Sequence, residues 1–519
     1  MNTLITNVTI IDGTGSAARE GELLFGDGVV KQVAYRRGEI GAGAAATTFD
    51  GRGLTLAPGF IDAHGHSDLS ILAAPEAVGK ISQGITTEIS GNCGLSPFPI
   101  TDLNREHLET LWKNYGEKLT WNDFAGYRRE LVRRNVAINL YSLCGHNTLR
   151  AAVAGYETRD LSRAQLDRMR VLLLDALQHG AAGFSTGLLY SPGVYSSEAE
   201  LLELAKVLAP FLRVYTTHLR SEGAQLLESV AESVRLCRGS GQRYLHISHL
   251  KTAGAANHYK IGELLEMIDR ENADGNLAVT ADRYPYVESL TQLSVALPPP
   301  YDRLDDVAVM SLLADPEKFS EAAAALASRG EDKLDSIRLV STGHRPFQRF
   351  IGMKFIEIGN ICFKPASLII AELLKADATG SMAAFCGMSM DNLRRILRRK
   401  YVACGTDESA RPLGYELGVS HPRGFGSMPK FMQMLMEEDF SLESALARMT
   451  SLPARIFNLS NRGVIAPDMA ADMVLFDPDR FHSEATFAKP HTPASGVHTV
   501  WVNGRIRYQH SQNRGDILW

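Results

Sequence analysis

The sequence predicts an α/β protein, in which a TIM-like (β/α)8 barrel is joined to a small β-sandwich domain built from both chain ends. Two observations predict this arrangement. The middle of the chain alternates short apolar runs, typical of buried strands, with amphipathic segments of helical period. The two ends instead carry short strand-like runs broken by Gly and Asp turns, which is hairpin material too small to be stable alone. A barrel inserted into a small β domain accounts for both patterns.

Size and composition fit an ordinary globular protein. The chain of 519 residues can bury the core of one large domain and a smaller one, and 45% hydrophobic with 22% charged residues excludes disorder. The net charge of −5 includes no long run of one sign, so nothing indicates nucleic acid or a membrane as a partner. Six cysteines are scattered singly, and neither a signal peptide nor a membrane-spanning run is visible. We therefore expect reduced thiols and a cytoplasmic protein.

The predicted β domain has a first part at residues 1–56 and a second part at 459–519. The first contains strand-like runs at 4–11 and 29–33, and the second contains one at 497–505. Because such short hairpins need partners, we expect strands from the two ends to pair and the termini to lie close together.

The predicted barrel occupies residues 57–458. Its eight strands are expected at 59–61, 81–90, 136–143, 182–185, 214–218, 244–249, 277–281 and 401–405, with helices at 162–179, 197–208 and 223–238 among the segments between them. The alternation breaks at about 297–353, which opens with three consecutive prolines at 298–300. We expect an insertion there, after the seventh strand, that shapes or covers the substrate pocket.

Polar residues follow several of the predicted strands. His64 and His66 come directly after the first strand and face one side, because alternate residues along a strand point to the same face. Alone, this pair indicates either a metal clamp or a surface turn. In a (β/α)8 barrel, however, catalytic groups project from the C-terminal ends of several strands. The residues at those positions are His64, His66, Cys93, His218, His249 and Asp407.

Four imidazoles, one thiol and one carboxylate suit zinc, which in catalytic sites keeps one position open for water. Each residue also has an ordinary interpretation: Cys93 could be a small buried hydrophobic residue, but Gly91 and Gly94 around it mark a tight loop. Asp407 could cap a helix, but Pro412 soon interrupts helix formation. Near a metal and its water, that aspartate could accept a proton and pass it to a leaving nitrogen.

Short motifs spread over nearly the whole chain carry these residues. They are Pro-Gly-Phe-Ile-Asp-Ala-His-Gly-His-Ser-Asp at 58–68, Gly-Asn-Cys-Gly at 91–94, Gly-His-Asn-Thr-Leu-Arg at 145–150, Gly-Phe-Ser-Thr-Gly-Leu-Leu-Tyr at 183–190, Thr-His-Leu-Arg-Ser-Glu at 217–222, Ser-His-Leu-Lys at 248–251, Asp-Arg-Tyr-Pro-Tyr at 282–286, Gly-Thr-Asp at 405–407 and His-Pro-Arg-Gly at 421–424. Together they resemble the amidohydrolase superfamily, and within it the N-acyl-D-amino-acid deacylase (D-aminoacylase) family.

The resemblance implies a zinc ion held tightly by Cys93, His218 and His249. His64 and His66 would form a second, weaker site. Most amidohydrolases bridge two metals with a carboxylated lysine, and no lysine stands at a matching strand end here. In the deacylase branch that the chain resembles, Cys93 would take that place.

The resemblance also implies an activity, zinc-dependent hydrolysis of the linear amide bond of N-acyl-D-amino acids. Asp407 would be the general base and acid, Tyr190 would help hold the scissile carbonyl, and Lys251 and Tyr284 would bind the α-carboxylate. The products would be a carboxylate and a free D-amino acid.

One departure concerns an arginine that family members typically carry for the carboxylate, after the Tyr-Pro-Tyr motif. Residues 287–300 contain no basic side chain here, so we expect Arg303 or Arg345 to substitute. Two alternatives stay open: a cyclic-amide hydrolase or deaminase on the same scaffold, and a catalytically inactive binding protein. The intact set of metal-type residues argues against the second.

Overall fold

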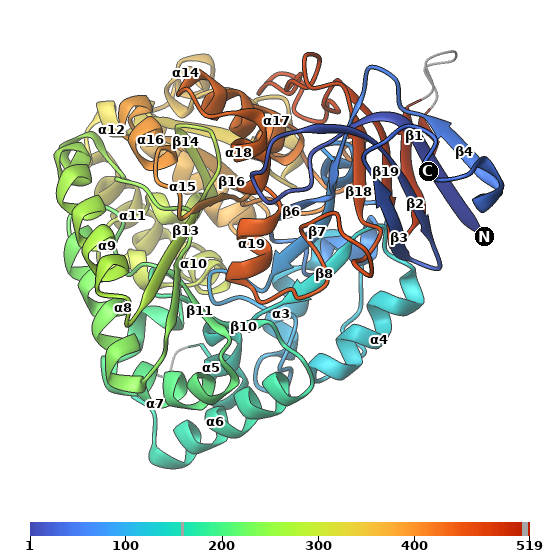
Figure 1. Ribbon diagram of the computed structural model, residues 1–519. Helices are drawn as coiled ribbons and strands as arrows, with labels where there is room; N and C mark the ends of the chain where they lie inside the picture. The colour runs from blue at the N-terminus through green and yellow to red at the C-terminus, as the bar shows by residue number, and fades with distance from the viewer. Residues whose placement is uncertain (157–159, 511–516, 519) are drawn as a thin grey trace.

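The computed structural model describes residues 1–156, 160–510 and 517–518. Of the predicted C-terminal segment 459–519, residues 511–516 and Trp519 therefore lie outside the described part. The architecture combines a (β/α)8 barrel with a sheet made from both chain ends (Figure 1). The predicted fold class is confirmed.

Parallel strands form the barrel. They are β6 (Phe60–Asp62), β7 (Ile85–Ser90), β8 (Asn139–Ser142), β9 (Cys144–Gly145), β10 (Gly183–Gly187), β11 (Val214–His218), β12 (Tyr244–Ile247), β13 (Ala278–Arg283) and β17 (Val402–Cys404). One residue separates β8 from β9, so the two fill one strand position. The ring closes between its last and first strands, where Ala63 N donates to Cys404 O at 3.0 Å and Asp407 N donates to His64 O at 2.7 Å. Eight strand positions result, each overlapping a predicted strand.

Helices cover the outside of the barrel. They are α1 (Ser70–Ala73), α2 (Val78–Ile81), α3 (Arg105–Leu111), α4 (Phe124–Arg134), α5 (His146–Ala154), α6 (Arg163–Gln178), α7 (Glu198–Leu208), α8 (Leu226–Ser240), α9 (Ile261–Asp274), α16 (Met390–Leu397), α17 (Arg423–Glu437), α18 (Leu442–Ala447) and α19 (Ser451–Ile456). The helix α6 begins at a capping box in which Ser162 and Gln165 each bond the other's backbone N–H. No helix in the described ranges combines the length and apolar character needed to cross a membrane.

Strands from both chain ends form one nine-stranded sheet. They are β1 (Asn2–Ile10), β2 (Arg19–Gly26), β3 (Val29–Ala34), β4 (Thr47–Asp50), β5 (Thr55–Pro58), β18 (Met473–Phe476), β19 (Val497–Val502), β20 (Arg505–His510) and β21 (Ile517–Leu518), in the order β21-β20-β19-β18-β5-β1-β2-β3 with β4 beside β1. The antiparallel pair of β5 with β18, which sets Pro58 opposite Met473, joins the two ends.

This sheet folds over on itself. Three strands separate β19 from β2, so a flat sheet would hold them about 19 Å apart at ~4.8 Å per strand. The rings of Trp501 on β19 and Phe25 on β2 nevertheless lie 5.8 Å apart. The two halves therefore pack face to face, as in a sandwich, although hydrogen bonds run continuously from one half to the other.

An insertion follows the seventh barrel strand. It comprises β14 (Glu288–Gln292), α10 (Asp306–Leu313), α11 (Pro316–Ala327), α12 (Glu331–Asp335), β15 (Ile337–Ser341), α13 (Arg345–Gln348), α14 (Phe355–Cys362), α15 (Ala366–Asp377) and β16 (Met382–Cys386), with the strands in the order β14-β16-β15. The predicted bounds of 297–353 were too narrow. The first and last strands of the insertion, β14 and β16, pair antiparallel, with Glu288 opposite Cys386. The sequence of β14 is too polar to be recognised as a strand.

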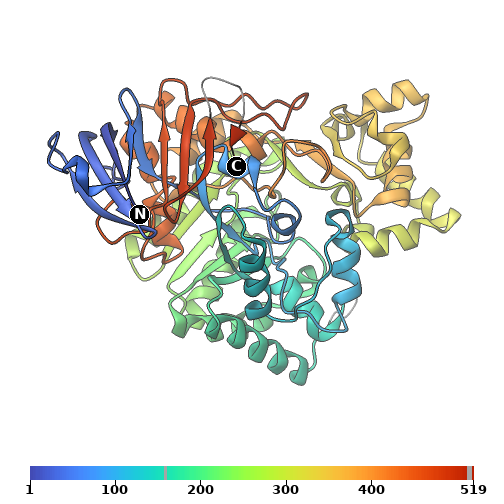
Figure 2. The ribbon, with the colours of Figure 1, turned by 90° about the vertical axis from the view of Figure 1, so that its right-hand side faces the viewer.

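The insertion has a hydrophobic core of its own, which includes Leu339, Ile370 and Leu373. Its helices stand out from the barrel on the side away from the sheet of the chain ends (Figure 2). Its strand β14 reaches back to the barrel, where Leu290 O accepts from Arg423 Nη2 at 3.4 Å.

Candidate metal centre

Three of the predicted site residues turn the backbone sharply where a strand ends. Cys93, His249 and Asp407 have φ angles of 52°, 36° and 52°, in the left-handed region that non-glycine residues rarely adopt. Backbone strain of this kind clusters at functional sites, because the surrounding packing has to hold it. At Gly94, next to Cys93, a Cβ would lie 2.2 Å from Asn147 Oδ1, which explains the glycine of this loop.

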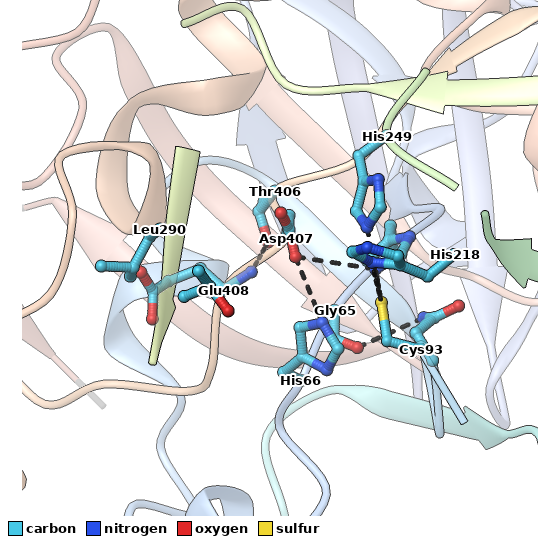
Figure 3. Close-up of polar contacts among 12 residues, drawn as sticks. Gly65, His66, Cys93, His218, His249, Leu290, Thr406, Asp407 and Glu408 are labelled. Carbon is cyan, nitrogen blue, oxygen red and sulfur yellow. Dashed lines mark hydrogen bonds and ion pairs between the residues drawn. The ribbon is translucent and has the colours of Figure 1, made fainter. Parts of the chain in front are cut away.

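The sulfur of Cys93 lies at the centre of the site. It is 3.5 Å from His64 Nε2, 3.6 Å from His218 Nδ1 and 3.4 Å from His249 Nε2 (Figure 3). A tetrahedral zinc with Zn–S near ~2.3 Å and Zn–N near ~2.1 Å separates its sulfur and nitrogen ligands by about 3.6 Å. The sulfur–nitrogen separations at Cys93 therefore match those of a tetrahedral zinc site.

Asp407 faces the same point from the last barrel strand. Its Oδ1 is 3.2 Å from His66 Nε2 and 3.6 Å from His64 Nε2. The ligand atoms fall into overlapping sets whose members lie within 4.8 Å of one another. The sets are Cys93 with His218 and His249, Cys93 with His64 and His66, and Asp407 with His64 and His249. Cys93 is thus shared by two of these candidate ligand sets.

Both acidic groups at this centre favour their ionised forms. Burial opposes ionisation of the Cys93 thiol, but the imidazoles of His64 and His249 hold its pKa well below the usual value. Burial likewise opposes ionisation of Asp407, and the Arg423 guanidinium holds the pKa of that carboxyl well below its usual range. A thiolate is the form of cysteine that binds metals.

The three predicted substrate-binding residues surround this centre. The Tyr190 ring lies 4.8 Å from the ring of His218, and its hydroxyl lies 3.2 Å from Thr291 Oγ1 on β14. Lys251 Nζ lies 2.8 Å from His249 Nδ1. The hydroxyl of Tyr284 is buried and has no hydrogen-bond partner among the described residues. Strand β14 thus brings the insertion into contact with the site.

The two arginines expected at the carboxylate site lie away from the centre, and a different arginine lies beside it. Arg303 and Arg345 are exposed, so neither reaches the buried centre. Arg423, the first residue of α17, is buried; its Nη1 lies 2.9 Å from Asp407 Oδ2, and its guanidinium lies 4.6 Å from the Tyr284 ring. The motif at 421–424 contains this residue, but nothing local indicated that it turns toward the strand ends.

Other buried charges support the site, and reasoning from strand ends gave them no role. Asp282, at the end of β13, accepts from His64 Nδ1 and His246 Nε2 at 3.0 Å each. Lys80 on α2 donates at 2.7 Å to Asp62 Oδ2, to Thr406 Oγ1 and to Glu408 O. Thr406 and Glu408 flank Asp407, so this ammonium fixes the loop that carries it. The role of Asp282 could have been predicted from its position at a strand end. Nothing in the sequence around Lys80 indicates a role at the site.

A (β/α)8 barrel that gathers imidazoles, a thiolate and a carboxylate at the C-terminal ends of its strands defines a metal-dependent barrel hydrolase. The chain matches the model of the amidohydrolase family over residues 47–330 and 421–508. This chain belongs to the amidohydrolase family.

Similar proteins indicate which branch of the amidohydrolase family this chain resembles. N-acyl-D-aspartate deacylase of Alcaligenes xylosoxydans xylosoxydans is 32% identical over 507 residues, which cover 97% of this chain and 91% of that protein. D-aminoacylase of the same organism is 31% identical over 525 residues, which cover 99% and 97%. Among solved structures, N-acyl-D-glutamate deacylase of Bordetella bronchiseptica, complexed with zinc and a phosphonate mimic of the tetrahedral intermediate, matches with a TM-score of 0.81 at 31% identity, over 99% of this chain and 98% of that chain.

Proposed function

We propose that this protein is a zinc-dependent deacylase that hydrolyses the amide bond of N-acyl-D-amino acids and releases a carboxylate and a free D-amino acid. The observation that carries the proposal is the Cys93 sulfur, placed 3.4 to 3.6 Å from three imidazole nitrogens beside the carboxylate of Asp407. The D configuration is taken from the similarity to D-amino-acid deacylases.

Cys93, His218 and His249 would hold the tight zinc, and His64 and His66 would complete a weaker second site that shares Cys93. Zinc in such a site supplies a Lewis acid that polarises the amide carbonyl and makes water acidic enough to attack near neutral pH. The ionised thiolate would contribute negative charge to both metal positions. Because this chemistry acts on an amide bond, a small-molecule amide is the partner that the site fits.

Asp407 would transfer the proton. Its carboxylate lies beside His64 and His66, where an attacking water would stand, and Arg423 keeps it ionised. It can therefore accept the proton of the water and then deliver it to the departing amine nitrogen. Tyr190, next to His218, would donate its hydroxyl hydrogen to the oxygen of the scissile carbonyl.

Lys251, Tyr284 and Arg423 would bind the α-carboxylate of the substrate. The ammonium and the guanidinium are buried close to the Tyr284 hydroxyl, which lacks a partner within the described ranges. Three hydrogen-bond donors, two of them on cationic side chains, match the acceptor oxygens of one carboxylate. Arg423 would thus take the place of the arginine that is absent from residues 287–300.

Replacing Lys251 by Met is expected to raise KM for an N-acyl-D-amino acid by about 10- to 100-fold, because a hydrogen bond to a charged group contributes ~1.5–3 kcal/mol. Steady-state kinetics measure the change. For the corresponding substrate that has an α-carboxamide, KM should change little. Lys206→Met, at an exposed ion pair with Glu203, is the matched control. An equal increase for both substrates would contradict the assignment.

The experiment that tests the activity is a paired panel of N-acetyl-D- and N-acetyl-L-amino acids with acidic, apolar and basic side chains, incubated with zinc-loaded protein. Release of free amino acid is expected from D substrates only. Turnover of hydantoin-like rings, or release of ammonia, with linear substrates untouched would instead support the cyclic-amide hydrolase or deaminase alternative.

We place the protein in the cytoplasm. Its six cysteines are all free thiols, which is typical of a reducing compartment.

A further inference from the structure

Glu222 lies directly behind the tight zinc site, in the loop that follows β11. Its side chain is 11% exposed. One carboxylate oxygen, Oε1, lies 2.9 Å from His249 Nδ1 and 2.5 Å from Lys251 Nζ. The other, Oε2, lies 3.7 Å from His218 Nε2. A single carboxylate thus faces two candidate zinc ligands and one candidate substrate-binding lysine.

The nitrogens that Glu222 faces are those that turn away from the sulfur of Cys93. His249 points its Nε2 at that sulfur. His218 points its Nδ1 at it. If those nitrogens bind zinc as neutral imidazoles, the opposite nitrogens must carry hydrogens. His218 Nε2 is buried, and no described residue hydrogen-bonds it, so the nearest Glu222 oxygen is the acceptor within reach of a small movement.

Lys251 gives a second reason for the carboxylate of Glu222 at this position. Its ammonium lies 2.8 Å from His249 Nδ1, next to the proposed position of a dication. Without a negative charge between them, the ammonium would repel the zinc and would compete with the hydrogen on Nδ1 for the same space. Glu222 Oε1 accepts from both groups and so lets a cation and a metal-binding histidine lie side by side.

We propose that Glu222 is a positioning residue that orients His218 and His249 for zinc and neutralises Lys251, so that the metal site and the carboxylate site can be adjacent. This inference rests on the proposed zinc deacylase function. Outer hydrogen-bond partners of ligating histidines typically change metal affinity by about 10- to 100-fold when they are removed.

The test is zinc affinity, measured by competition with a chromophoric chelator in the absence of substrate. Glu222→Gln is expected to weaken zinc binding about 10- to 100-fold. The double variant Glu222→Gln/Lys251→Met should recover part of that loss, because it also removes the cation that Glu222 neutralises. A residue with a merely structural role would not give this rescue, and the double variant leaves no unpaired buried charge to unfold the protein.

Glu232→Gln is the matched control, since Glu232 bonds Arg220 at 2.9 Å in the same region and should leave zinc affinity unchanged. Wild-type zinc affinity in Glu222→Gln, or a further loss instead of a recovery in the double variant, would overturn the inference. Because substrate is absent, failure of the protein to hydrolyse N-acyl-D-amino acids would refute the proposed function without altering the zinc result.

Discussion

The Asp407→Asn variant is expected to lower kcat for N-acyl-D-amino acids by about 10²- to 10⁴-fold, the range that a general acid–base residue contributes. The amide has the shape of the carboxylate but cannot take up the proton. It can still accept a hydrogen bond from His66 Nε2, which lies 3.2 Å from Asp407 Oδ1, so the loop should keep its position. We therefore expect the loss in kcat with little change in zinc content.

Steady-state kinetics together with metal analysis of the same preparation check this result. Asp269→Asn is a suitable control, because Asp269 forms a surface ion pair with Arg399 at 3.1 Å and should keep full activity. A zinc-replete Asp407→Asn protein that retained more than about a tenth of wild-type kcat would show that proton transfer does not depend on this carboxylate.

Cys93→Ala is expected to abolish hydrolysis through loss of the metal. Cys93 is the one residue common to the two ligand sets that contain cysteine, and alanine removes both the sulfur and its charge. The loss of zinc affinity should exceed the ~10- to 100-fold typical of removing an outer hydrogen-bond partner, because a direct ligand is lost. Chelator competition and zinc content of the purified protein measure it.

Cys144→Ala is the matched control for this variant. Cys144 is fully buried on β9, and burial raises the pKa of its thiol to about 12, so it has no thiolate to offer a metal. We expect this variant to retain zinc and activity. Hydrolysis that survived both Cys93→Ala and stripping of zinc by a chelator would refute a zinc mechanism.

Much of the barrel was predictable because its signals are local. Apolar runs such as 182–185 and 401–405 contain strands that are buried on both faces, and that burial is encoded in their own residues. The capping pair Ser162 and Gln165 likewise fixed the start of a helix. Strand β14, with the polar sequence Glu-Ser-Leu-Thr-Gln, carries no such signal, and its partner β16 lies about a hundred residues later in the chain, so the limits of the insertion were missed.

The sequence by itself determined which chemistry is available and where the chain offers it, since a histidine, cysteine or aspartate that follows a barrel strand must emerge at one rim. Only the tertiary structure decided which groups meet there. Arg423 reaches Asp407, and Glu222 faces both His218 and His249, through the packing of separate loops and helices. Distances between such segments depend on how the whole barrel closes, and no local pattern of residues encodes them.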